Sequence, residues 1–161
     1  TSFSGSIVML GYGAIGQCSL PMLLDLFDVP PERYRVVAKD EAAERFAPYA
    51  ARGVTFLHRV IRRDNVGTVM AEVARPGDLG LNLTVGVDSI VIADWCHRHG
   101  VAYVDTAIEP WTDASVDLDI APAERTEYAF HTRAPEPGPS SPTAYRPSTT
   151  GATKAPPTAI R

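Results

Sequence analysis

Apolar runs of a few residues recur along most of the chain. Each is followed by a longer stretch in which hydrophobic residues return every three or four positions. Such runs are typical of buried strands, and the longer stretches are typical of helices that pack one face against a sheet. The strands predicted in this way cover residues 6–10, 34–38, 54–60, 79–85 and 102–108, and the predicted helices cover 14–27, 41–52, 65–74 and 88–99.

Several local signals refine these helices. Pro21 lies inside the first helix and should kink or shorten it, because proline lacks the N–H that an interior turn needs. Pro48 should interrupt the second helix, which Gly53 then ends. Asp88 or Ser89 can cap the start of the last helix.

The order of the predicted elements indicates the fold class. Strands and helices alternate at short intervals, which is the signature of a parallel sheet with helices on both faces. Right-handed crossovers then favour an α/β doubly wound, Rossmann-like sheet with strand order 3-2-1-4-5.

Composition narrows the class of protein. The chain has 161 residues, 45% hydrophobic and 21% charged, with a formal net charge of -4. That balance argues against nucleic acid as a partner, and no apolar run reaches the roughly 18 residues that span a bilayer. We expect no membrane partner, no secretory signal, a cytoplasmic location and two free thiols, Cys18 and Cys96.

The prolines divide the chain into two regions. Seven of the 14 prolines lie in residues 131–161, where Ile160 is the only large aliphatic residue. Such a segment buries too little apolar area to offset the entropy cost of ordering it. We therefore expect a folded domain over residues 1–130 and a tail over 131–161 that is disordered or unrelated to the domain.

The first predicted strand runs directly into the sequence GYGAIG, which matches the dinucleotide-binding fingerprint. Gly11 suits the tight turn, Gly13 lets the backbone approach a pyrophosphate, and Gly16 permits close packing of helix on strand. Ala14 and Ile15 open the helix, where free N–H groups and the helix dipole favour phosphate. These five residues are candidate cofactor ligands.

Asp40 follows the second strand, near the roughly 20-residue offset at which a carboxylate binds the adenosine ribose. A carboxylate there favours NAD over NADP, although Lys39 and Arg45 leave the choice open. Asp40 can instead cap the next helix, and Glu41 is the close competitor for the ribose.

Two further strand ends carry polar residues at the edge where open α/β sheets bind ligands. Asn82 can bind the cofactor or hold its own loop, and Thr106 is a second cofactor candidate. Glu109 and Trp111 follow close to where a nicotinamide would lie. A carboxylate and an indole suit a cationic amine, so both are candidate catalytic residues. The alternative is an exposed Glu and a Trp packed under a loop.

A metal site is not expected. Cys96 and His99 stand three residues apart at the end of a predicted helix, a spacing that is more often accidental than metal-binding.

The chain resembles the homospermidine synthase family of the saccharopine dehydrogenase-like group. The resemblance is carried by GYGAIGQ with the Leu-Pro pair that follows it, by NLTV, by WCHRHGVAYVDTAIEPW and by AERTEYA. The glycine turn is shared with many dehydrogenases, whereas IEPW after the VDT strand is specific to this family.

The resemblance implies a function. The family binds NAD and condenses two putrescine molecules to homospermidine with release of ammonia, through hydride abstraction, imine exchange and hydride return. It implies pyrophosphate binding by the three glycines, ribose binding by Asp40 and a substrate-amine role for Glu109. For the full-length enzyme a homodimer is compatible with it.

Two departures from the family pattern matter. The family has an Asp after NLSV, where this chain has Gly86, and family members continue into a substrate domain for which 161 residues leave too little room. We therefore expect an amino-terminal, NAD-binding piece that is inactive alone. A saccharopine dehydrogenase-type or carboxyspermidine-type NAD(P) oxidoreductase and a non-catalytic nucleotide-binding module remain as alternatives.

Overall fold

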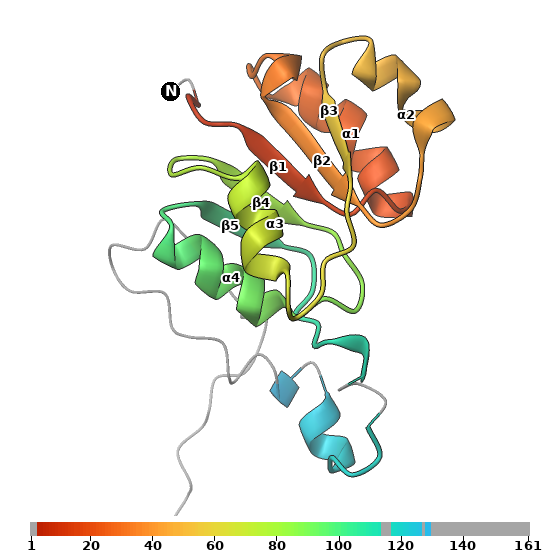
Figure 1. Ribbon diagram of the computed structural model, residues 1–161, viewed down its shortest axis with the longest axis vertical. Helices are drawn as coiled ribbons and strands as arrows, with labels where there is room; N and C mark the ends of the chain where they lie inside the picture. Colours follow the sequence, from red (N-terminus) through yellow and green to blue (C-terminus); the bar gives the residue numbers. More distant parts are fainter. Residues whose placement is uncertain (1–2, 114–116, 127, 130–161) are drawn as a thin grey trace, which may run out of the picture.

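Strands and helices alternate along the computed structural model, which describes residues 3–113, 117–126 and 128–129 (Figure 1). The tail expected over 131–161 lies outside these residues. Among the described helices none combines the length and apolar character needed to cross a membrane. The elements are β1 (Ile7–Leu10), α1 (Ala14–Leu26), η1 (Pro31–Arg33), β2 (Tyr34–Ala38), α2 (Ala43–Ala50), β3 (Thr55–His58), α3 (Val66–Val73), β4 (Leu79–Asn82), α4 (Ser89–Arg98), β5 (Ala102–Asp105) and η2 (Pro122–Arg125).

The five strands form one parallel sheet in the order β3-β2-β1-β4-β5. β1 lies at the centre, with Leu10 opposite Val37 of β2 and Asn82 of β4. Its four residues are all buried, as a central strand covered on both faces requires. The predicted fold class and strand order are confirmed.

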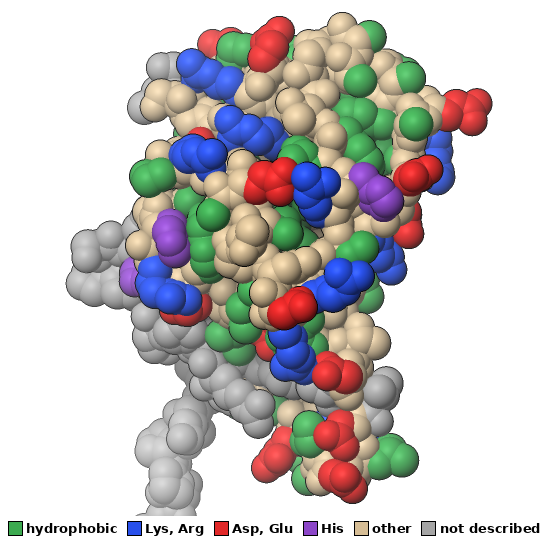
Figure 2. Space-filling view, viewed as in Figure 1, with side chains coloured by type: hydrophobic (Ala, Val, Ile, Leu, Met, Phe, Trp, Pro, Cys, Tyr) green, Lys and Arg blue, Asp and Glu red, His purple; other side chains and the backbone are tan. Residues whose placement is uncertain are grey.

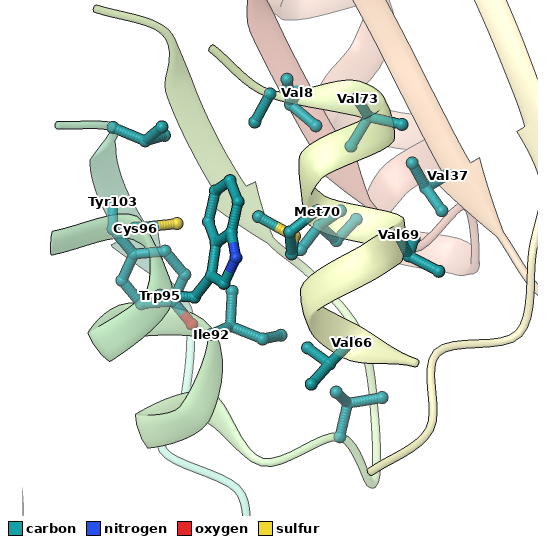
Figure 3. Packing of buried hydrophobic residues seen from close by; sticks show 14 of the residues in the cluster. Val8, Val37, Val66, Val69, Met70, Val73, Ile92, Trp95, Cys96 and Tyr103 are labelled. Carbon is teal, nitrogen blue, oxygen red and sulfur yellow. The ribbon is translucent and has the colours of Figure 1, made fainter. Parts of the chain in front are cut away.

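Helices cover the two faces of the sheet in pairs. α3 and α4 lie on one face, and α1 and α2 lie on the other (Figure 1). On the first face the indole of Trp95 lies between Met70 of α3 and Tyr103 of β5 (Figure 3). On the second face Leu20 and Leu24 of α1 join the apolar side chains of β1 and β2. Burial on both sides stabilises the short central strands.

Three strands end earlier than the apolar runs predict: β3 at His58, β4 at Asn82 and β5 at Asp105. At the last two, the side chain bonds the backbone N–H two residues ahead. Asn82 Oδ1 accepts from Thr84 N at 3.2 Å and Asp105 Oδ1 accepts from Ala107 N at 3.3 Å. These Asx-type turns lead the chain out of the sheet, so apolar character alone overestimates the strand lengths.

The helices also differ from expectation. α1 continues through Pro21 to Leu26 and is not shortened there, because burial of Leu20 and Leu24 on the sheet holds both halves in place. α2 likewise contains Pro48. The predicted cap of α4 is confirmed, since Asp88 accepts from the N–H groups of the next turn at 3.0 and 3.2 Å.

A buried carboxylate joins three segments at the edge of the sheet where the parallel strands begin. Asp78, only 5% exposed, accepts from the backbone N–H of Ser6 at 2.7 Å and of Arg75 at 2.9 Å. Its second oxygen also receives the guanidinium of Arg35 at 3.3 Å. The side chain therefore satisfies donors from the start of β1, from β2 and from the turn before β4.

Asp78→Ala should lower the free energy of unfolding by about 3 kcal/mol, because hydrogen bonds to a charged acceptor are lost and buried donors are left without partners. Asp28→Ala, which removes an exposed carboxylate, should change it by less than about 0.5 kcal/mol. Urea unfolding monitored by tryptophan fluorescence measures both, and equal midpoints for the two variants would contradict this role.

Candidate nucleotide-binding site

A pocket of about 410 Å³ opens at the carboxyl edge of the sheet. Its walls come from the glycine turn after β1, from the segments that follow β2 and β3, and from residues 83–85 and 87 after β4. All four segments leave the sheet at its carboxyl edge, because parallel strands place their ends together. Ligands of open α/β sheets bind at this edge.

The three glycines of the turn differ in whether the fold itself requires glycine at their positions. Gly11 has φ +97°, and a Cβ there would lie 2.6 Å from the carbonyl oxygen of Leu83. At Gly16 a Cβ would lie 2.5 Å from the carbonyl oxygen of Gly11. Gly13, by contrast, has a negative φ, and a Cβ there would meet nothing within 4 Å. The fold therefore requires Gly11 and Gly16, whereas the space beside Gly13 is open.

That open space lies at the start of α1. Gly13 is the N-cap residue, and no side chain caps the helix. Ala14 and Ile15 are exposed and open the first turn, where backbone N–H groups have no carbonyl partner within a helix. With the helix dipole, these donors fit a diphosphate, and the absence of a side chain at Gly13 leaves room for its approach.

Charged side chains of both signs line the pocket beyond the turn: Lys39, Asp40, Glu41, Arg45 and Arg59. Asp40 and Glu41 are both exposed. The N-cap of α2 is Ala42, and no side chain caps that helix, so the alternative that Asp40 is a helix cap is wrong. Arg59 is paired with Glu72 at 2.8 Å.

Tyr12, between the first two glycines, faces the interior. Its ring packs edge-on against Phe46 at 5.2 Å and Phe56 at 6.1 Å, so the turn is anchored in the core between α2 and β3. Burial raises the pKa of its phenol, with a smaller contribution from Tyr49. The side chain of Gln17 donates to the Tyr12 carbonyl at 3.1 Å and braces the same turn.

None of the described residues after β5 is among those that line the pocket. Thr106 is exposed just beyond the strand. Glu109 Oε2 accepts from the backbone N–H of Gly86 at 2.6 Å, and the backbone of Glu109 bonds Ser89 at both its N–H and its carbonyl. Glu109 thereby fastens the β4–α4 loop, and its catalytic role stays a prediction.

Trp111 is 8% exposed and belongs to the core under α3 and α4. The guanidinium of Arg63 lies 5.2 Å from its ring centroid and also pairs with Asp113 at 2.6 Å. This is the arrangement of a Trp packed under a loop, with a cation of the chain itself on its ring. A catalytic role for Trp111 stays a prediction.

Some pocket residues escape the sequence reasoning. Val60, Ile61 and Val87 line the pocket, as does Gln17. The first three stand in or beside apolar segments, and their spacing carries no sign that the strands end before them. A usable signal is position alone: each follows a strand at the carboxyl edge.

The viewed face of the molecule carries interspersed charges. Figure 2 shows Lys and Arg side chains among Asp and Glu side chains over the face that carries α3 and α4. Such mixing differs from the basic face through which proteins hold nucleic acid.

Comparison with known proteins also points to a nucleotide-binding domain. Residues 7–136 match the family described as saccharopine dehydrogenase NADP binding domain. The chain belongs to this family. It is 34% identical over 129 residues to a homospermidine synthase of Blastochloris viridis, and 28% identical over 130 residues to one of Mesorhizobium japonicum. The resemblance drawn from the motifs is confirmed.

The matched part is short relative to these proteins. It covers 78% of this chain but 27% of the Blastochloris protein, and 79% of this chain but 26% of the Mesorhizobium one. The chain thus spans about a quarter of the length of the curated relatives.

A solved structure shows the same fold. The homospermidine synthase of Legionella pneumophila in complex with NAD matches with a TM-score of 0.70, at 24% identity. The match covers 83% of this chain and 27% of that one.

For this member of the saccharopine dehydrogenase group, Gly13→Ala should separate binding from folding. The added methyl enters open space, so the free energy of unfolding should change by less than about 1 kcal/mol. NAD affinity should fall at least about tenfold, because the methyl occupies the approach of the diphosphate.

Gly16→Ala is the matched control. Its methyl meets the Gly11 carbonyl, so stability should fall by about 2 kcal/mol. Urea unfolding measures the change in stability of each variant, and isothermal titration with NAD measures the change in affinity. Unchanged NAD affinity in Gly13→Ala would exclude this turn as the diphosphate site.

Proposed function

We propose that the chain binds NAD in the pocket at the carboxyl edge of the sheet. The observation that carries the proposal is the open backbone at Gly13, which faces uncapped N–H groups at the start of α1. These groups would hold the diphosphate. Membership of a nucleotide-binding family and likeness to an NAD complex support it.

The remaining walls divide the nucleotide between them. Asp40, exposed after β2, would accept hydrogen bonds from the adenosine ribose. Val60 and Ile61, after β3, would form the apolar wall beside the adenine. Thr84 and Val85, after β4, lie on the opposite side of the glycine turn from Asp40 in the strand order and would face the nicotinamide half.

The choice between NAD and NADP depends on charge near the ribose. A carboxylate at Asp40 repels a 2′-phosphate, whereas Lys39 and Arg45 on the same wall attract one. Because Asp40 follows β2 at the ribose offset, we propose NAD as the cofactor.

We further propose that the chain supplies the cofactor-binding part of an enzyme that condenses two putrescine molecules to homospermidine with release of ammonia. Bound NAD would supply a reversible hydride acceptor. Glu109, at the same edge of the sheet, is the proposed carboxylate for the substrate amine. The indole of Trp111 already carries the guanidinium of Arg63 on its ring, so any contact of Trp111 with the substrate amine would have to displace Arg63.

Asp40→Asn should weaken NAD binding about tenfold, because a charged acceptor of the ribose hydroxyls is lost. The same change should improve NADP binding relative to NAD, since repulsion of the 2′-phosphate is removed. Glu41→Gln is the matched control and should leave both affinities within about twofold. Isothermal titration with both nucleotides decides the assignment, and the reverse pattern would transfer it to Glu41.

This chain alone, incubated with NAD and putrescine, should release no ammonia, because relatives carry about three quarters of their length outside the matched part. A coupled ammonia assay tests this, with titration of NAD in the same preparation as the control for a competent site. Steady ammonia release would contradict the proposal that this chain supplies only the cofactor-binding part of the enzyme. Accumulation of reduced nicotinamide would instead favour an oxidoreductase, and nucleotide binding without turnover in any longer form would favour a non-catalytic module.

A further inference from the structure

The side chain of Asn82 is buried at the end of β4 with all of its hydrogen-bonding groups engaged. It is 1% exposed. Nδ2 donates to the Asp105 carboxylate at 2.9 Å and to the Tyr103 hydroxyl at 3.1 Å. Oδ1 accepts from Thr84 N at 3.2 Å and from Thr84 Oγ1 at 2.6 Å. An amide has two donors and two lone pairs, so none remains for a ligand.

The partners allow the amide only one orientation. A carboxylate such as that of Asp105 only accepts, and the backbone N–H of Thr84 only donates. Tyr103 donates its hydroxyl proton to the same Asp105 carboxylate, and burial together with that carboxylate raises the pKa of the phenol. The hydroxyl therefore keeps its proton at physiological pH and donates it to Asp105.

Thr84, which Asn82 holds, is part of the pocket wall. The backbone at Leu83 and Thr84 also lies against the glycine turn, because a Cβ on Gly11 would be 2.6 Å from Leu83 O and 3.1 Å from Thr84 N. A shift of Thr84 would therefore move both the nicotinamide-side wall and the support of the diphosphate turn.

We propose that Asn82 is a positioning residue for the nucleotide: it fixes Thr84, and through it the pocket wall, without touching the ligand. Tyr103 and Asp105 of β5 hold the amide in place. This inference rests on the proposed binding of NAD, and it replaces direct cofactor binding by Asn82 with an indirect action through Thr84.

Two matched pairs of variants test the arrangement by isothermal titration with NAD. Tyr103→Phe removes the hydroxyl that bridges Asn82 and Asp105, and should weaken NAD binding about fivefold. Tyr34→Phe removes a hydroxyl bonded to the Leu23 carbonyl at the far end of the sheet, and should leave NAD affinity unchanged at a similar loss in urea midpoint. Equal NAD affinities of these two variants would overturn the proposal.

The second pair acts at the pocket wall. Thr84→Val removes the hydroxyl that donates to Asn82 Oδ1 and should weaken NAD binding about tenfold, while Thr84→Ser keeps the hydroxyl and should retain most of the affinity. A double-mutant cycle with Asn82→Ala then separates indirect from direct action. If Asn82 acts through Thr84, the double variant binds no more weakly than the weaker single variant; losses that multiply would show that Asn82 binds NAD itself.

A readout without nucleotide keeps this inference distinct from the proposed function. The Thr84 amide should be protected from hydrogen exchange in the free protein, and Tyr103→Phe, but not Tyr34→Phe, should speed its exchange. If the wild-type chain shows this protection and binds neither NAD nor NADP, the proposed function fails while the hold on Thr84 stands. If Thr84 exchanges equally fast in all three proteins, the positioning role fails. That result counts against it even where Asn82→Ala does not fold.

Discussion

The close contact between the turn after β1 and the backbone after β4 controls the rest of the site. Gly11 adopts a left-handed backbone conformation, and its Cα lies so near Leu83 that no side chain fits between them. Gly16 then fits against the Gly11 carbonyl, which sets how closely α1 approaches the sheet. The direction of α1, the placement of its free N–H groups and the position of the pocket wall all follow from this contact between backbones.

The fold was predictable because its determinants are local. Central strands such as Ile7–Leu10 are buried on both faces and so are continuously apolar, and the turn glycines are needed for backbone conformation and close approach. Strand ends were less predictable. Leu83 and Val85 are as apolar as a strand residue, yet β4 stops at Asn82 because its amide bonds the backbone ahead. That bond depends on partners from β5, which no local pattern reveals.

The candidate site residues also differ in whether local sequence is enough to place them. Asp40 lies on the pocket wall because its place after β2 is enough to put it there. Glu109 and Trp111 are suited to an amine by residue type. Residue type does not reveal, however, that other groups of the same chain already contact these two side chains. Glu109 bonds the N–H of Gly86, and Trp111 packs beneath Arg63. A carboxylate or an indole at the carboxyl edge of the sheet is therefore weaker evidence for a catalytic site than the glycine turn is for a nucleotide site, because such side chains can be used by the chain itself.

Gly86 stands where the resemblance to the family leads us to expect an Asp. It has φ +73°, a backbone conformation that residues other than glycine rarely adopt, and a Cβ there would overlap the Thr112 hydroxyl, so an Asp at this position would need the Thr112 side chain to move. Here the loop is closed at both ends: Asn82 holds Thr84, and Glu109 holds Gly86. Because Glu109 follows β5, the loops after β4 and β5 are tied into one hydrogen-bonded unit. The Gly86 end of the loop therefore depends on the Glu109 carboxylate, while residues at its other end, such as Thr84, line the pocket, so the position of this pocket wall depends on side chains from both β4 and the segment after β5.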